Sequence, residues 1–172
     1  MTDLEVCNWA LAKLGEAPLE SLDDVNHVHA LRCKALLQPL HQSLLRQYEW
    51  SFATVTEQLS PLQQEEAGNW TYPLPRLCLR VVKPQNLNRR GMTLYSSTKE
   101  ALSVTYIKEV KISDCDPLYC ELLACKLAFE LCVRIREAEG LKSSLSRDFE
   151  DAWDKAVLAS SKEYPGEQEY YD

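Results

Sequence analysis

Glycine is scarce in this sequence, and it contains no long apolar run. Five glycines among 172 residues exclude a collagen-like chain and argue against a flexible, low-complexity one. No apolar run approaches the roughly 20 residues that a membrane-spanning helix needs. The composition is 45% hydrophobic and 26% charged. It is that of a soluble globular protein without membrane partners, and the length suits one compact core.

Motifs that usually mark an enzyme are also missing. We find no glycine-rich phosphate loop, no G-x-S-x-G elbow, no H-E-x-x-H and no dinucleotide fingerprint. The three histidines fall within one predicted helix, which allows few arrangements of nucleophile and base. His29 and Cys33 are one helical turn apart, but two ligands do not make a metal site. We therefore predict no catalytic residue, no metal and no cofactor, and a protein that is not an enzyme.

A secretion signal and a disulfide framework are not indicated either. The first residues, MTDLEVCNWALAKLG, carry acids early and lack a cationic region. This pattern indicates a helix, so we expect the protein to stay in the cell that makes it. Seven cysteines are an odd number, and their spacing differs from that of zinc knuckles. We expect reduced thiols that pack as small hydrophobic side chains.

Helical periodicity is present at both ends of the sequence. Thr2 and Glu5 have the spacing of a capping box and Gly15 stands where a helix commonly ends, which predicts a helix over about 2–14. A second helix is predicted over about 24–48, with Pro39 as a kink or a break. Its expected apolar stripe is Val28, Leu31, Leu36, Leu40 and Leu44.

Two further helices are predicted near the C-terminus. Asp116 and Pro117 suit the start of a helix over about 117–138, and Gly140 suits its end. Apolar residues at helical spacing then predict a last helix over about 141–162.

Between these helices the period changes from that of a helix to that of a strand. LSVTYIKEV alternates, with Leu102, Val104 and Tyr106 on one face, and LCLRVV and MTLYSS are short and β-rich. The connections are too short for the crossover helices of a parallel sheet. We predict an α+β fold, mainly a helical bundle, with a small antiparallel sheet inserted at about 53–112. The expected organisation is one domain over 1–162 and an extended tail over 163–172.

Charge is distributed unevenly along the chain, whose net charge is −7. Residues 76–111 carry eight Lys or Arg and two Glu, whereas residues 112–172 carry seven basic and fourteen acidic residues. The basic segment has three interpretations: a strip that faces DNA phosphates, a contact with acidic helices of a neighbouring copy, or a solvated face. The candidates for a channel or inter-subunit patch are Arg76, Arg80, Arg89, Arg90, Lys108 and Lys111.

The last ten residues combine acids with aromatics. Residues 163–172 hold four acids, three tyrosines and no base. Tyrosine gives a large contact area at low entropic cost, so this segment suits docking on a basic groove of a partner. The alternative is a frayed, solubilising terminus. The candidate docking residues are Tyr164, Glu167, Glu169, Tyr170, Tyr171 and Asp172.

Four motifs in order carry a family resemblance: LEVCNWALAKLGEAPLESLDD, LLRQYEWSFA, YPLPRLCLRV and LSVTYIKEVKISDCDPLYCELLACKLAFEL. Over about residues 4–160 the chain resembles the tail tubular protein A, or head-to-tail adaptor, family of short-tailed bacteriophages. Cys7-Asn8 and Leu14-Gly15 match motifs of the family's first helix. In the hinge motif, Glu49 and Ser51 replace a proline and an asparagine, while Trp50 and Phe52 stand as in the family.

The resemblance implies a structural virion protein of the tail or neck, present in the host cytoplasm during assembly. It implies a self-assembled ring, a dodecamer, that binds the portal protein above and a tail nozzle resembling tail tubular protein B below. Double-stranded DNA would pass through without sequence readout. Trp50 and Phe52 would form a helix–sheet corner that makes the subunit rigid. The alternative is a small α+β regulator that binds nucleic acid or a host factor.

Overall fold

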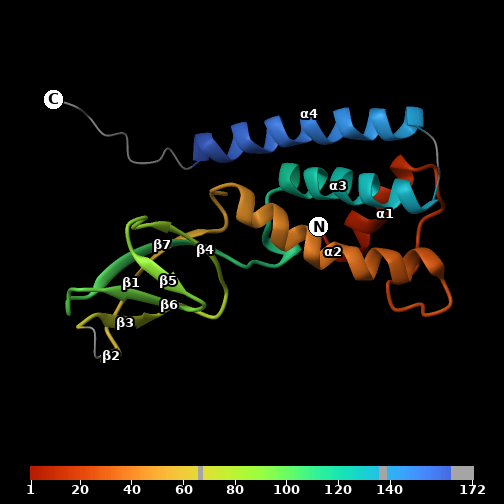
Figure 1. Ribbon diagram of the computed structural model, residues 1–172. Helices are drawn as coiled ribbons and strands as arrows, with labels where there is room; N and C mark the ends of the chain where they lie inside the picture. The colour runs from red at the N-terminus through yellow and green to blue at the C-terminus, as the bar shows by residue number, and fades with distance from the viewer. Residues whose placement is uncertain (66–67, 136–138, 164–172) are drawn as a thin grey trace. The chain divides into compact units, whose positions relative to one another are not determined.

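The computed structural model describes residues 1–65, 68–135 and 139–163. The chain divides into two compact units (Figure 1). A helical unit comprises Met1–Phe52 and Val110–Asp172, and a β unit comprises Ala53–Glu109. Four α-helices and two small antiparallel sheets are found among the described residues, which confirms the predicted α+β fold. The prediction of one domain over 1–162 with a tail over 163–172 stays a prediction.

Helix α1, Asp3–Lys13, begins and ends as the sequence predicts. The Thr2 hydroxyl accepts a hydrogen bond from the backbone N–H of Glu5, and the Glu5 carboxylate accepts one from the N–H of Thr2. This reciprocal capping box satisfies two donors that a helix start otherwise leaves free. Gly15 follows the helix with φ +71°, a conformation that glycine adopts without steric cost.

Helix α2, Val28–Gln47, begins about four residues later than predicted. A turn forms first: the Asp24 carboxylate accepts from the backbone N–H of Asn26, and the Asp24 carbonyl accepts from that of His27. Asp24 therefore stabilises a turn before the helix and does not cap it. The helix runs through Pro39 as one element, which excludes the break of the two alternatives predicted there, and the kink stays a prediction.

The apolar stripe predicted for α2 is also wrong in part. Val28 and Leu31 are 53% and 48% exposed. The face that packs in the core has residues 3 or 4 apart over most of its length, but small or polar side chains occupy three of its positions. Its buried members are Ala30, Cys33, Leu37, His41, Leu44 and Leu45.

Helices α3, Pro117–Ile135, and α4, Glu139–Glu163, complete the helical unit. Asp116 caps α3, since its carboxylate accepts from the backbone N–H of Leu118 at 2.7 Å. Gly140 lies in the first turn of α4 and does not end α3 as predicted. The first N–H groups of a helix have no intrahelical partner, so a glycine at this position weakens few hydrogen bonds and is tolerated.

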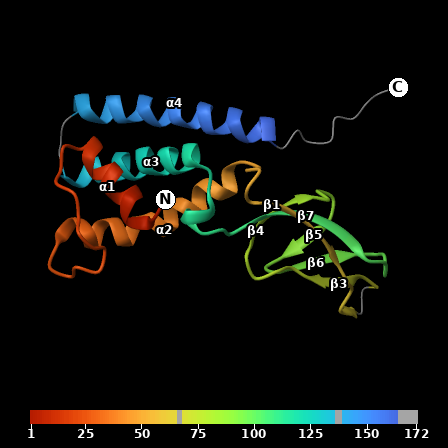
Figure 2. The same ribbon diagram turned by 180° about the vertical axis from the view of Figure 1, so that it is seen from behind.

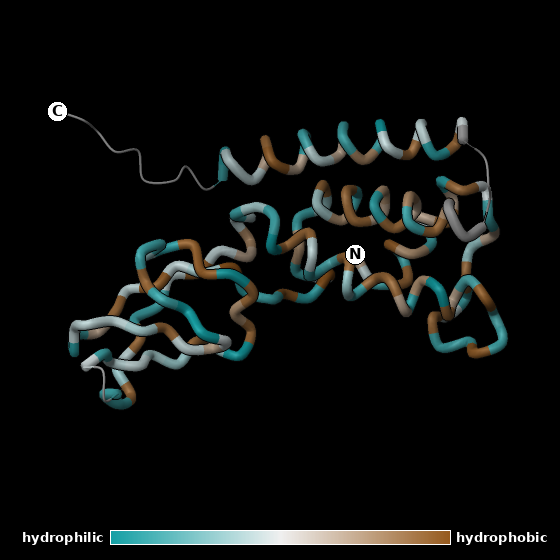
Figure 3. The backbone as a smooth tube through the Cα atoms, in the orientation of Figure 1, coloured by the Kyte–Doolittle hydropathy of each residue, from teal (hydrophilic) through white to brown (hydrophobic). Residues whose placement is uncertain are grey.

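Helix α3 is the centre of the helical unit. Helices α1, α2 and α4 all pack against it (Figures 1 and 2). Figure 3 shows apolar residues concentrated along α3, whereas apolar and polar stretches alternate along α4. All seven cysteines are buried and free, which confirms that prediction. Among the described residues, no helix is both long and apolar enough to cross a bilayer.

The β unit contains two sheets, where the sequence predicted one. Three strands, in the order β1-β7-β4, are Thr54–Leu59, Leu102–Lys108 and Cys78–Lys83. Four strands, in the order β2-β3-β6-β5, are Gln63–Gln64, Trp70–Pro73, Thr93–Ser96 and Asn88–Arg90. All strand pairs are antiparallel. A short 3-10 helix, Ile112–Asp114, follows in the helical unit.

Two sheets form because each has an apolar face that needs cover. Val104 and Tyr106 of the first sheet and Tyr72 and Leu94 of the second belong to one buried cluster. Val104 and Tyr106 lie on one face of β7 and Leu102 packs against the same cluster, as their alternation predicted. A single flat sheet would leave these side chains in water.

Candidate interaction surfaces

Trp50 and Phe52 lie where the chain leaves the helical unit. Trp50 is fully buried, and its indole N–H donates to the Leu44 carbonyl at 3.0 Å. Its ring packs edge-on against Tyr119 and Trp153 and stacks on Phe52. The corner is thus an aromatic cluster within the helical unit. That it also fixes the unit to the sheet stays a prediction.

A second contact fixes the point where the chain returns to the helical unit. His41 is 1% exposed, and its Nε2 lies 2.8 Å from the Val110 carbonyl. A carbonyl only accepts, so Nε2 carries the proton and donates. The Tyr119 hydroxyl lies 3.0 Å from both the His41 carbonyl and His41 Nδ1, two acceptors for its single proton, and burial raises the Tyr119 pKa. Tyr119 therefore contacts Phe52, after which the chain leaves the helical unit. It also contacts His41, which binds Val110, where the chain returns.

The loop between α1 and α2 is held by one side chain. The Asn8 amide donates to the Leu19 carbonyl at 3.0 Å, and the Asn8 side-chain carbonyl accepts from the Leu19 N–H at 2.7 Å. This two-bond clamp imitates a strand pair and fixes the loop on α1. The sequence identified Cys7-Asn8 only as a motif; a polar residue on an otherwise apolar helix face was the signal for this role.

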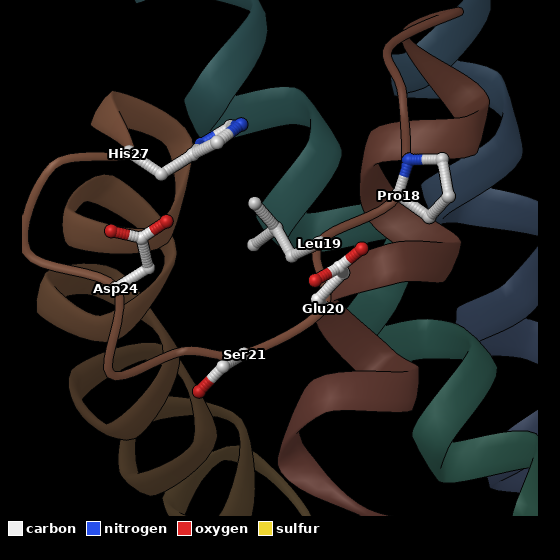
Figure 4. A pocket seen from close by; sticks show the side chains of 6 residues that line it. All are labelled: Pro18, Leu19, Glu20, Ser21, Asp24 and His27. Atoms are coloured by element: carbon white, nitrogen blue, oxygen red, sulfur yellow. The ribbon is translucent and has the colours of Figure 1, made fainter.

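The clamped loop surrounds a cavity of about 310 Å³. Figure 4 shows Asp24 and His27 on one side, Pro18 and Glu20 on the other, and Leu19 between them. Leu19 is buried and gives the cavity an apolar wall, whereas the two carboxylates are exposed. Beside it Val25, Val28 and Leu31 are 73%, 53% and 48% exposed. The sequence did not predict this surface.

The structure divides the predicted basic patch into separate groups. Arg80 and Lys108 lie on the adjacent strands β4 and β7, while Arg89 and Arg90 lie on β5 of the other sheet. Arg76 is exposed just before β4. Lys111 belongs to the helical unit, whereas the other five residues belong to the β unit.

Arg89 and Arg90 are at the end of a tight hairpin. The strands β5 and β6 are joined through Gly91 and Met92, and Gly91 has φ +57°. Only the first turn residue has positive φ, the pattern of a type II′ turn. The Arg90 guanidinium lies 5.3 Å from the Tyr95 ring centroid, and Met92 is 40% exposed. Arg89 donates from Nε to the Gly91 carbonyl at 2.9 Å.

Other sites predicted from the sequence are not located. Tyr164, Glu167, Glu169, Tyr170, Tyr171 and Asp172 lie outside the described residues. In the described ranges, no group of three or more His, Cys, Asp or Glu is placed to hold a metal ion.

Comparison with known families decides what kind of protein this is. Residues 4–114, more than half of the chain, match the family model described as Tail tubular protein. The chain belongs to the tail tubular protein family. Among curated proteins, none matches it.

The matched segment of this tail tubular protein includes α1, the clamped loop, α2 and the whole β unit. Membership makes the chain a structural protein of the bacteriophage tail, with a place in the virion and a non-enzymatic role.

Proposed function

We propose that this tail tubular protein is a head-to-tail adaptor. Copies of the chain form a ring, a dodecamer, that joins the portal protein to the tail nozzle and leaves a bore for double-stranded DNA. The observation that carries this proposal is the family match over residues 4–114. The order and spacing of the four motifs extend the likeness into α3.

Features of the fold support a ring subunit. Trp50, His41 and Tyr119 fix the two points at which the chain leaves and re-enters the helical unit. Because these points are fixed, each copy of the helical unit presents the same surface to its neighbours. Residues 76–108 of the β unit carry seven Lys or Arg and one Glu, whereas residues 112–172 carry seven basic and fourteen acidic residues. Unlike charges on different parts of one chain suit a head-to-tail contact between identical copies.

The C-terminal segment is the proposed contact with portal. Residues 164–172 combine three tyrosines with three carboxylates and contain no base. Aromatic anchors contribute most of the affinity in many interfaces, and acids direct encounter with a basic surface. DNA passes the ring without base contacts, because its backbone charge alone is recognised.

Cryo-electron microscopy of the phage virion tests the proposal. The expected result is a ring of twelve copies between portal and nozzle, into which the α3–α4 pair and the two-sheet unit both fit. Particles that lack this protein, prepared in parallel, should lack that ring. The proposal fails if the chain is found only away from the portal or in no closed ring.

A further inference from the structure

The acidic pocket comprises the six residues that line the cavity beside α2: Pro18, Leu19, Glu20, Ser21, Asp24 and His27. Residues 14–31 contain four carboxylates and no Lys or Arg. Two of these carboxylates are already engaged, Glu16 with His29 at 3.7 Å and Asp23 with Lys34 at 2.7 Å. Within the described ranges, Glu20 and Asp24 form no ion pair, and both are exposed at the cavity.

Exposed apolar residues continue from the acidic pocket. Val25 follows Asp24 directly, and Val28 and Leu31 lie one turn apart at the start of α2. Exposed apolar side chains next to a concave, charged surface are typical of a protein contact. The clamp from Asn8 fixes the loop in this form before any partner binds, which lowers the entropic cost of docking.

The hairpin tip, residues 89–92, has the complementary character. Residues 85–95 contain two arginines and no acid. Arg89 and Arg90 are exposed and form no ion pair in the part of the chain that the structure describes. Between them and β6 the Met92 side chain is 40% exposed, and methionine adapts to irregular apolar surfaces. The tight turn through Gly91 brings Arg89, Arg90 and Met92 together within four residues at the end of one hairpin.

We propose that the hairpin tip of one copy docks into the acidic pocket of the next copy around the ring. Arg89 and Arg90 pair with Glu20 and Asp24, and Met92 packs on Val25 and Val28. The contact is heterologous because its two surfaces are different parts of the chain, and such contacts close into rings. This inference rests on the proposed function and names the interface that builds the ring.

Charge argues against the C-terminal segment of this chain as the occupant of the acidic pocket. Residues 163–172 carry four acids and no base, so the C-terminal segment would be repelled by Glu20 and Asp24. The hairpin tip brings two positive charges to two uncompensated negative charges. A second copy is therefore the occupant that the charges favour.

Charge reversal with rescue tests the contact. The full chain is mixed with portal protein, and ring formation is measured by mass photometry. Arg89→Glu/Arg90→Glu and, separately, Glu20→Arg/Asp24→Arg should each weaken assembly at least tenfold. The chain carrying all four substitutions should recover most of it. The matched control, Arg76→Glu/Lys99→Glu, makes the same charge change on exposed residues outside the hairpin tip and should assemble normally.

Cysteine cross-linking shows which segments meet. Met92→Cys and Val28→Cys chains, mixed with portal and oxidised with diamide, should give a disulfide-linked pair only when both variants are present. Leu62→Cys with Val28→Cys is the control, because Leu62 is 70% exposed but lies outside the hairpin tip. The oxidant takes up the two electrons and two protons that the thiols release.

The outcomes separate this contact from the ring itself. If wild-type rings form but reversal has no effect, rescue fails or no cross-link appears, the contact is wrong and the adaptor function stands. If the wild-type chain forms no ring with portal, both are overturned. The melting curve of each variant is measured first. If a variant that fails to assemble also melts differently from the wild type, its failure is assigned to misfolding, and the cross-linking experiment then decides.

Discussion

Trp50 is a fully buried aromatic residue of the helical unit. It buries an indole ring against Tyr119 and Trp153 and donates to the Leu44 carbonyl. We expect Trp50→Ala to lower the free energy of unfolding by about 3–5 kcal/mol, since the truncation leaves a cavity. Urea melts measure this. Trp50→Phe keeps most of the buried area and should cost clearly less; a loss under about 1 kcal/mol for alanine would show that the ring does not stabilise the fold.

Asn8 tests whether one side chain fixes the loop of the acidic pocket. Asn8→Ala removes both hydrogen bonds to Leu19, and we expect a loss of about 1–3 kcal/mol in the free energy of unfolding. Hydrogen exchange at the Leu19 amide should become faster. Asn26→Ala, on the exposed part of the same loop, is the control and should cost under about 0.5 kcal/mol. Unchanged exchange at Leu19 would contradict the clamp.

The free energy of unfolding should fall in alkali because of Tyr106. Burial, and then the hydrogen bond that its hydroxyl donates to Glu57 at 2.9 Å, raise the pKa of Tyr106 to about 12. In the unfolded chain the pKa is about 10. The stabilisation is complete below pH 10 and is lost as the pH rises toward 12, because only the unfolded state ionises there.

Melts of Tyr106→Phe between pH 8 and 12 check this. The variant lacks the ionisable hydroxyl, so its stability should fall less steeply above about pH 10 than that of the wild type. Glu57→Gln should keep most of the dependence, because burial is the larger cause. Identical slopes for Tyr106→Phe and the wild type would contradict the assignment.

Local rules predicted both ends of α1 and the start of α3, but they failed at the start of α2, at Gly140 and on one buried helix face. Thr2, Glu5, Gly15 and Asp116 act through partners two or three residues away, so the sequence contains their whole environment. The core stripe of α2 includes His41, which is buried only because Tyr119 and Val110 provide hydrogen-bond partners. Such partners are distant in sequence, and hydropathy alone therefore favoured Val28 and Leu31.

At the scale of elements, the sequence predicted strands at β4, β6 and β7, but not β1, β2, β3 and β5 or the pairing of the strands. The alternation in β7 identified its buried face. That β6 pairs with β3 and β5, and not with the first sheet, depends on which apolar faces meet in the core. Contacts of this kind are set by tertiary packing, which periodicity does not encode.

The C-terminal segment is the element whose removal separates docking from folding. Deleting residues 164–172 should leave the far-ultraviolet circular dichroism and the melting curve nearly unchanged, since these residues lack apolar periodicity. Portal binding, measured by interferometry, should fall sharply. Tyr170→Ala/Tyr171→Ala should weaken binding at any salt, whereas Glu167→Gln/Glu169→Gln should matter mainly at low salt. Undiminished binding of the truncated chain would assign docking to another surface.

At the scale of the whole molecule, the sequence showed which segments are charged but not which charged residues lie together in the fold. The sequence shows an excess of basic residues over 76–111, and five of the six candidates lie in the β unit, whereas Lys111 lies in the helical unit. Their division between two sheets, and the acidic pocket on the helical unit, follow from chain folding. A cavity built by a loop, one amide clamp and the start of a helix has no signature in composition.

Mass measurement of assembly tests the adaptor function most directly. The purified chain is measured alone and then mixed with portal protein, at low and at high salt. Alone it should be a monomer or a weak oligomer; with portal, the complex should gain twelve chain masses, and high salt should reduce that gain because the contacts between copies are ionic. A portal complex that gains no mass contradicts the adaptor function, and a stable dodecamer without portal contradicts assembly on a template.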